Sequence, residues 1–425
     1  NDLIGLRWTR ARRGGGSLDV RANLSRYGSN LTLPDFADTN FSSVINQRQF
    51  RVDLDTRPSP AIQAKVGGSI EWMGYDNLLE TGGTQFGGGN GSGWLTGLYA
   101  QSTWSQPRTW VIEGGARVDL WRPNRGDQII EIAPRVALKR FFKDGDLALK
   151  VAAGRYTQFL HSLRDEDLPI GLDVWVVAGE RAPPVVSDQI QLGVEGYLGE
   201  DWFWALEGYS RNFKGVVSVN GADDPNDDLD DILAGEGLSY GADLLIRKEE
   251  GTLTGWAALS FLKADRTFPD TYSPFLPKPE ISYPPIFDRR IDFDLVLRYP
   301  LPWGWDGGLR WNFGSGVPYT RPIGSHRYYL PDFARREGLL ARDGSAVVLS
   351  ERNGSRYAPY HRLDVSFRKT FEKSWGTIVP YLDIANVYNQ KNVLFYFFDY
   401  RARPPTRSGI SMFPVLPTFG LEVRF

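Results

Sequence analysis

The sequence predicts an all-β protein, a transmembrane antiparallel β-barrel, from three observations: residue alternation, segment length and the pattern of connections. In 291–299, for example, Ile291, Phe293 and Leu295 alternate with Asp292 and Asp294. Such period-two alternation places apolar side chains on one face of a strand and polar ones on the other. The alternating segments exceed the roughly 5–6 residues of a soluble strand and match the roughly 9–11 residues of a tilted transmembrane strand.

Short and long connections alternate along the chain. Turn-forming residues occupy 57–60, 143–145, 198–200, 248–251 and 373–376, and long polar segments occupy 28–47, 76–93, 159–187, 216–237, 267–288 and 320–360. Tight turns on one side and long loops on the other are typical of outer-membrane barrels. We expect about 17 strands, and because single-chain bacterial barrels close with an even number, we expect further strands before residue 1.

Composition excludes several other classes of protein. The 425 residues contain no cysteine and three histidines, with a net charge of -2. The chain therefore has no disulfide framework, no thiolate metal site and no charge excess that would suggest nucleic acid as a partner. The 14 Trp, 19 Tyr and 24 Phe suit pleated strands and interfacial girdles. No apolar run is long enough for a transmembrane helix.

Catalytic motifs are missing from the sequence. Neither G-x-S-x-G nor H-E-x-x-H occurs. Ser and His come together only at 161–162 and 325–326, both in expected loops. We expect that the protein is not an enzyme and has no catalytic residues.

An acidic loop is the one candidate metal site. The segment 223–231 contains six Asp in nine positions, and Asp223, Asp224, Asp227 and Asp228 could supply oxygen ligands to Ca²⁺. The spacing and the distal Glu of an EF-hand are absent. We therefore expect a solvated acidic loop and no cofactor, with Ca²⁺ as the alternative.

Several later segments match a known family in its order. They are IAPRVAL (132–138) with LKVAAGRYTQF (149–159), SDQ (187–189), YSRNF (209–213), LSYGAD (238–243), DRR (288–290), SGVPYT (315–320), YHRLD (360–364), IANVYN (384–389) and PTFGLEVRF (417–425). Together they resemble the barrel of TonB-dependent outer-membrane receptors, with Asp243 where that family usually has Glu. The first 120 or so residues carry no diagnostic motif.

The resemblance implies an architecture and a location. It implies that 1–425 is one barrel domain in the bacterial outer membrane, part of a 22-stranded barrel. The N-terminal plug domain and the TonB-contacting segment of such receptors are not found in 1–425. The implied partners are the protein's own plug, TonB, the barrel-assembly machinery, outer-membrane lipid and lipopolysaccharide; a surface lipoprotein is a further partner that the resemblance allows.

The resemblance also assigns roles to side chains. Alternation puts charges of both signs on the lumen-facing side, where they would contact the plug or pair across strands: Glu131, Arg135, Glu207, Arg211, Asp243, Arg247, Arg290, Asp292, Asp294, Arg362, Asp364 and Arg368. The last strand ends on an aromatic residue and resembles the family's barrel-assembly signal: Phe419, Leu421, Val423 and Phe425. Loop residues with aromatic or basic side chains are candidate ligand contacts: Trp175, Arg321, His326, Arg327, Tyr328 and Tyr329.

Three functions remain open at this point. The leading hypothesis is TonB-dependent uptake of a scarce ligand, such as an iron chelate, a cobalamin or an oligosaccharide. The alternatives are a structural barrel that acts as a scaffold in a larger outer-membrane complex, and a passive porin. The sequence does not distinguish the ligands, because aromatic and basic loop residues suit sugars and anionic chelates equally.

Overall fold

The computed structural model describes residues 1–12, 15–33, 39–81, 84–163, 173–220, 231–269, 280–328, 344–400, 402 and 406–425. Most of these residues form strands, and two short 3-10 turns occur among them, η1 (Lys143–Gly145) and η2 (Pro302–Gly304). No helix of the described residues is long and apolar enough to cross a membrane.

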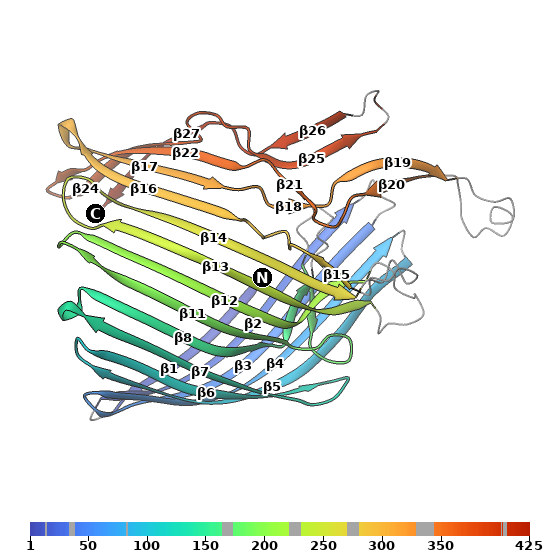
Figure 1. Ribbon diagram of the computed structural model, residues 1–425, viewed down its shortest axis with the longest axis horizontal. Helices are drawn as coiled ribbons and strands as arrows, with labels where there is room; N and C mark the ends of the chain where they lie inside the picture. The colour runs from blue at the N-terminus through green and yellow to red at the C-terminus, as the bar shows by residue number, and fades with distance from the viewer. Residues whose placement is uncertain are drawn as a thin grey trace. The chain divides into compact units, whose positions relative to one another are not determined.

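The strands follow one another along the chain, as Figure 1 labels them. The first part contains β1 (Asp2–Ala11), β2 (Gly16–Leu33), β3 (Thr39–Ser59), β4 (Ile62–Thr81), β5 (Thr84–Gln106), β6 (Trp110–Pro123), β7 (Ile129–Phe142), β8 (Leu147–Gln158), β9 (Leu160–Leu163), β10 (Val174–Val177), β11 (Val185–Leu198), β12 (Trp202–Val219) and β13 (Ile232–Lys248). The rest contains β14 (Thr254–Pro269), β15 (Glu280–Tyr283), β16 (Ile291–Leu301), β17 (Trp305–Gly314), β18 (Pro318–Tyr319), β19 (Pro322–Tyr328), β20 (Gly344–Leu349), β21 (Ser355–Arg356), β22 (Tyr360–Lys369), β23 (Phe371–Lys373), β24 (Gly376–Ala385), β25 (Val393–Asp399), β26 (Thr406–Ser411) and β27 (Leu416–Arg424).

One antiparallel sheet contains most of these strands. Among the described residues it has 19 strands, of which β15 and β23 are only four and three residues long. The other seventeen agree with the strand count expected from the sequence. The chain divides into unit 1 (Asn1–Tyr197, Ala205–Tyr240, Arg266–Ser282) and unit 2 (Leu198–Trp204, Gly241–Asp265, Tyr283–Phe425), which are described separately below.

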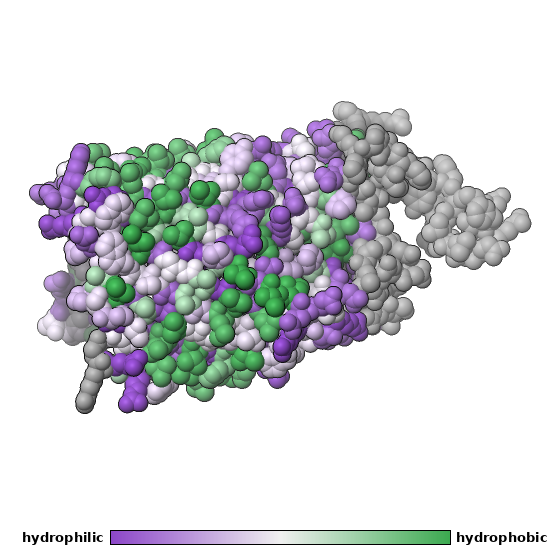
Figure 2. All heavy atoms as spheres, turned by 60° about the horizontal axis from the view of Figure 1, so that its bottom comes forward, coloured by the Kyte–Doolittle hydropathy of each residue, from purple (hydrophilic) through white to green (hydrophobic). Residues whose placement is uncertain are grey.

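The sheet of unit 1 has one polar and one apolar face. Its strands pair in chain order from β1 to β8, and β8 pairs with β11. On one face Arg21 lies opposite Arg51 and Asp19 opposite Asp53, and on the other Val20 lies opposite Val52. Period-two alternation therefore separates charges from apolar side chains, as predicted. Figure 2 shows hydrophobic residues gathered over the middle of the face that it draws and hydrophilic residues toward both ends.

The sheet of unit 2 has the same two-faced organisation. β14 pairs with β16, β16 with β17, β17 with β22, β22 with β24 and β24 with β27. Asp294 and Asn312 lie opposite each other on the polar face of this unit, and Leu295 and Trp311 on the apolar face. Large apolar side chains on this face are exposed, including Phe419 and Phe425. Exposed apolar faces of this extent need a nonaqueous surrounding.

The loop lengths inferred from the sequence need one correction. The expected short turns are confirmed, since β7 and β8 are joined through η1, β11 and β12 through 199–201, and β23 and β24 through 374–375. The expected long connections at 28–47 and 76–93 are wrong, because strand pairing continues through most of both segments. Polar residues pair there as regular strands because a ladder satisfies their backbone groups whether or not a face is apolar.

Candidate functional site on the polar face

A chain of ion pairs crosses the polar face of unit 1. Asp19 on β2 is almost fully buried and accepts hydrogen bonds from Arg7 Nε (2.6 Å), Thr9 Oγ1 (2.8 Å) and Arg21 Nε. Each donor lies on the same strand or the adjacent one, so the sheet register alone brings them together. A buried carboxylate with two guanidinium partners is stabilised as an anion.

An ion pair between an Arg and an Asp of one strand recurs on β3 and on β6. Arg51 Nε lies 3.0 Å from Asp53 Oδ2, and Tyr99 links the two by accepting from Arg51 Nη2 (2.9 Å) and donating to Asp53. On β6, Arg117 Nη2 lies 2.7 Å from Asp119 Oδ1. An Arg and an Asp two residues apart lie on one face of a strand, which lets the pair form without any loop.

The sequence contained a signal for these residues that motif comparison missed. Arg and Asp are separated by one apolar residue at 19–21, 51–53, 117–119 and 362–364. Only the last of these was singled out from the sequence, because the first 120 residues carry no family motif. The repeated spacing itself would have identified the polar face of β2, β3 and β6.

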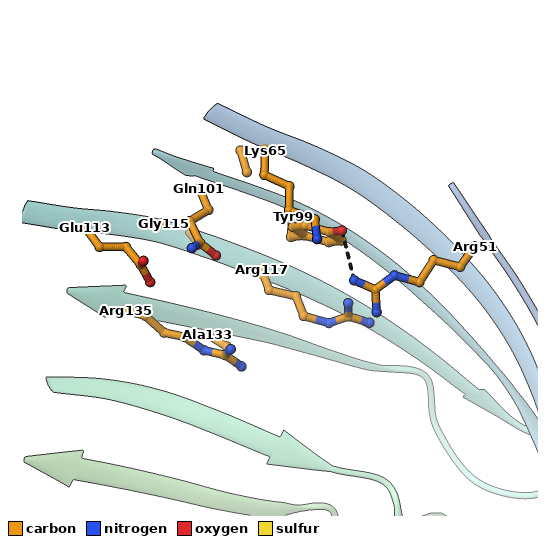
Figure 3. A pocket seen from close by; sticks show the side chains of 11 residues that line it. Arg51, Lys65, Tyr99, Gln101, Glu113, Gly115, Arg117, Ala133 and Arg135 are labelled. Atoms are coloured by element: carbon orange, nitrogen blue, oxygen red, sulfur yellow. Dashed lines mark hydrogen bonds between the residues drawn. The ribbon is translucent and has the colours of Figure 1, made fainter. Parts of the chain in front are cut away.

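A cavity of about 310 Å³ opens on this polar face. Figure 3 shows the side chains that project into it from neighbouring strands, with the Arg51–Tyr99 hydrogen bond dashed. Its polar lining consists of Arg51, Lys65, Tyr99, Gln101, Glu113, Arg117 and Arg135. Arg51 and Arg117 are neutralised by their own Asp neighbours, whereas Lys65 and Arg135 form no ion pair among the described residues. Glu113 is the one carboxylate in this lining, so the cavity has a positive excess.

A second cluster of charges lies on β7, β8, β11 and β12 of unit 1. Lys150 Nζ lies 2.7 Å from Glu195 Oε2 and also contacts Glu207, and Lys139 contacts Glu195. The alternating signs along Lys139, Glu195, Lys150 and Glu207 neutralise one another. Glu207, expected on the lumen side, is thereby placed on the polar face with a definite partner.

The hairpin β9–β10 packs against the polar face of unit 1. Its Trp175 is fixed at both backbone groups, with the N–H donating to Ser43 Oγ (3.3 Å) and the carbonyl accepting from Asn77 Nδ2 (2.8 Å). Trp121 of β6 donates through Nε1 to Ala178 O (2.8 Å) and stacks on Phe159. The apolar core between the hairpin and the sheet consists of Met73, Tyr75, Trp121, Phe159, Leu163, Val176, Val177, Ala178 and Ala182. The hairpin therefore covers part of this face, at the end of the strands away from the short turns.

His161 lies in this hairpin and makes its stability depend on pH. Burial lowers the pKa of His161 to about 4, and Nε2 has no partner among the described residues. The unfolded histidine, with a pKa of about 6.5, binds a proton more readily than the folded one. The contribution of neutral His161 to the stability of the folded hairpin is therefore fully present above about pH 6.5. It falls by up to about 3 kcal/mol as the pH drops toward 4.

Hydrogen exchange of the β9 and β10 amides between pH 7 and pH 4.5 measures this effect, after correction for the intrinsic exchange rate. The variant His161→Gln should remove most of the pH dependence. Equal protection of the wild-type hairpin at both pH values would contradict the prediction.

One buried carboxylate organises the loop end of unit 2. Asp288 is fully buried and accepts from Ala264 N (2.8 Å), from Arg290 Nε (2.9 Å) and from Arg356. Arg356 Nη1 also donates to the carbonyls of Asp288 (2.7 Å) and Gly316 (2.9 Å). The DRR motif at 288–290 therefore joins β14, the segment before β16 and the segment around β21.

Three tyrosines pack together in the loop segments of unit 2. The ring centroids of Tyr319 and Tyr357 are 4.4 Å apart, and those of Tyr357 and Tyr396 are 5.3 Å apart. Arg407 on β26 lies over the Tyr396 ring at 4.4 Å. This cluster was not predicted, because its members are separated by up to 88 residues (407 − 319) and follow no local period.

A cavity of about 800 Å³ lies on the polar face of unit 2. Four arginines and four carboxylates line it: Arg298, Arg310, Arg368, Arg424, Asp306, Asp364, Asp383 and Glu422. The four positive and four negative charges balance, whereas the cavity of unit 1 has a positive excess. Paired charges of this kind suit contact with a polar surface or with water more than selection of one charged ligand.

The charges predicted for the lumen are distributed over both polar faces. In unit 1, Glu131 and Arg135 lie on the same face of β7, and on β12 the Arg211 guanidinium packs on the Tyr209 ring at 4.7 Å. In unit 2 the pairings are Arg247 with Glu249, Arg290 with Asp288, Asp292 with Arg289, Asp294 with Asn312, Arg362 with Asp364 and Arg368 with Asp383. Asp243 lies four residues after the buried Ser239 on β13, so the two side chains are on the same face of the strand. Cross-strand and same-strand pairing accounts for most of them, and contact with a plug stays a prediction.

The remaining predicted residues lie in three places. Phe419, Leu421, Val423 and Phe425 share the exposed apolar side of β27 and its end. Trp175 lies in the β9–β10 hairpin, whereas Arg321 lies next to β19. His326, Arg327 and Tyr328 belong to β19, but their side chains and Tyr329 lie outside the described residues, as do Asp223, Asp224, Asp227 and Asp228. The described part of the chain contains no group of three or more potential metal ligands.

Solved structures share this fold, although sequence comparison finds no relative. No family model and no curated protein sequence matches the chain significantly. The ferripyoverdine receptor of the outer membrane of Pseudomonas aeruginosa, bound to ferripyoverdine, aligns with a TM-score of 0.64 and 10% identity over 99% of this chain and 55% of that one. The FrpB iron transporter of Neisseria meningitidis (F3-3 variant) aligns with a TM-score of 0.61 and 14% identity, over 99% of this chain and 61% of that one. The ferric citrate transporter FecA in its unliganded form aligns with a TM-score of 0.62 and 10% identity, over 99% of this chain and 60% of that one.

The alignments cover nearly the whole chain but only about three fifths of these proteins. All three are named as receptors or transporters. Identities of this size establish the fold and leave the ligand open. The polar faces of the two units correspond to the lumen side of such a barrel, and the apolar faces to the lipid side. The chain has the fold of the outer-membrane barrel of TonB-dependent receptors, as its late-strand motifs indicated.

Proposed function

We propose that the protein is the barrel of an active outer-membrane receptor that takes up a scarce ligand, with an anionic metal chelate as the favoured class. The observation that carries the proposal is the fold, because proteins that share it are named as receptors or transporters for ferripyoverdine, iron and ferric citrate. Cobalamin and oligosaccharides are the other classes that the same fold allows.

The charged polar face supports active transport over passive diffusion. Receptors of this fold class close their lumen with a plug, and a wall of paired charges offers it polar contacts throughout. The positive excess at Lys65 and Arg135 provides an attachment point for an acidic group of the plug or of the ligand. Plug, TonB and barrel-assembly machinery are the partners that this proposal requires.

The cationic residues and aromatic rings at the loop end support the ligand class. Arg407, whose guanidinium lies over the Tyr396 ring, is exposed and can bind an anionic group of the ligand. The β9–β10 hairpin, which covers part of the polar face of unit 1, lies where an entering ligand would meet the wall.

Uptake by living cells tests the proposal against its alternatives. A strain that lacks the gene is compared with the wild type for growth on ferric chelates, cobalamin and oligosaccharides as sole sources, with and without an intact TonB system. Ligand accumulation that needs both the protein and TonB supports active uptake. Accumulation without TonB, together with conductance of the full-length protein in a planar bilayer, would indicate a porin, and no effect on any ligand would favour a scaffold.

Removing the positive excess of the unit 1 cavity should slow uptake. In the double variant Lys65→Gln/Arg135→Gln, two cations without carboxylate partners are lost, and charged hydrogen bonds contribute roughly 1.5–3 kcal/mol each. We expect uptake to fall by about tenfold or more at a normal amount of protein in the outer membrane. The matched control is Arg140→Gln, since Arg140 lies on the same strand as Arg135 but stacks on Trp110 on the opposite face. Equal uptake by the double variant and the control would exclude a role for this cavity.

A further inference from the structure

Four side chains form one row across the apolar face of unit 1. Arg48 on β3 lies opposite Trp72 on β4, Trp72 lies opposite Trp94 on β5, and Trp94 lies opposite Arg122 on β6. The Arg48 guanidinium lies over the Trp72 ring at 5.0 Å from its centroid. We call these four residues the Arg–Trp row.

The Arg–Trp row lies about midway along β3, β4 and β5 and at the loop end of β6. Arg122 is followed directly by the β6–β7 connection, where its Nε donates to Gln128 Oε1 (3.0 Å). The next row toward the short turns contains Phe50, Ile70 and Leu120, and Phe50 and Ile70 are exposed. The Arg–Trp row thus marks the border between the apolar band and the loops, where interfacial tryptophans are expected.

The two arginines of the row are unusual for a lipid-facing wall. Both are exposed, and neither forms an ion pair among the described residues. A guanidinium without a protein anion at a membrane border is available to an anion of the membrane.

We propose that the Arg–Trp row binds the phosphorylated sugar head of the outer-leaflet glycolipid, with one phosphate at each arginine. Three strand spacings of about 4.8 Å separate Arg48 from Arg122, which gives about 14 Å between their backbones. A disaccharide with a phosphate at each end has a comparable length. Trp72 and Trp94 lie between the arginines, and the exposed Trp94 ring supplies a flat apolar surface on which a sugar ring packs.

The rival explanation is that the arginines only stack on neighbouring tryptophans. A cation–π contact is worth about 0.5–1 kcal/mol at an exposed site and requires no phosphate. The turn end of the same face contains a pair that fits this explanation, since Arg140 lies over Trp110 at 4.3 Å. Arg140 is therefore a matched control with the same chemistry at the other end of the strands.

The test uses the full-length protein purified from outer membranes and freed of bound lipid. Affinity is measured for the lipid A portion of the glycolipid carrying two phosphates, one phosphate or none. The proteins compared are the wild type, Arg48→Gln/Arg122→Gln and Arg140→Gln, each checked for folding by its heat-modifiable mobility on gels.

The wild type should bind the doubly phosphorylated glycolipid most tightly and the unphosphorylated one least. The double variant should bind the doubly phosphorylated form about 30-fold more weakly, the equivalent of about 2 kcal/mol for two basic residues. Arg140→Gln should stay within about twofold of the wild type. If the wild type does not distinguish the three glycolipids, the proposal is overturned even where the double variant fails to fold. Equal losses in the double variant and in Arg140→Gln would also overturn it.

Discussion

Replacing Asp288 with alanine should destabilise the protein by about 3–5 kcal/mol, because it leaves two guanidinium groups without their shared carboxylate. Asp288 is fully buried and joins Arg290, Arg356 and the Ala264 N–H. Loss of the carboxylate also frees Arg356, which ties together the carbonyls of residues 288 and 316. The free energy of unfolding in denaturant, followed by tryptophan fluorescence in detergent micelles, measures the effect.

Two further variants show whether the buried charge is responsible. Asp288→Asn retains the shape and one acceptor oxygen, so it should give an intermediate loss. Asp292→Ala removes a half-exposed carboxylate that pairs with Arg289, and exposed pairs contribute about 1 kcal/mol or less. Equal losses for Asp288→Ala and Asp292→Ala would show that Asp288 has no special role.

Trp121→Ala should detach the β9–β10 hairpin from the polar face of unit 1. Trp121 is fully buried, stacks on Phe159 and donates to Ala178 O. Truncation of a buried tryptophan costs about 3–5 kcal/mol, which is large compared with the few other contacts of so short a hairpin. We expect the amides of Leu160–Leu163 and Val174–Val177 to exchange with solvent at least 100-fold faster.

A tryptophan on the opposite face provides the control for this experiment. Trp104 of β5 is 38% exposed on the apolar face, so Trp104→Ala should leave hairpin exchange unchanged. Unchanged protection in Trp121→Ala would mean that the hairpin is held by Trp175, Ser43 and Asn77 alone. In that case the apolar core would not be what keeps it on the wall.

The sequence by itself determined the strands and their two faces. Period-two alternation places Leu295 and Asp294 on opposite sides of β16 whatever the neighbouring strand is, so fold class and strand number followed from local pattern. The prediction from sequence failed at 28–47 and 76–93, where the polar composition suggested loops but the structure has paired strands. The reason is that a strand whose backbone is paired on both sides tolerates polar side chains beyond the membrane.

Only the tertiary structure decided which charges meet and what covers them. Asp53 accepts a hydrogen bond from the hydroxyl of Tyr99, 46 residues away, because the register of three strands brings them together. Asp288 meets Arg356 across 68 residues, and Trp121 meets Ala178 across 57. The same holds for the Arg–Trp row, whose members are unremarkable singly and form a row only through register. Alternation gives each residue a face, but a partner depends on how strands are aligned, and local sequence does not encode that alignment.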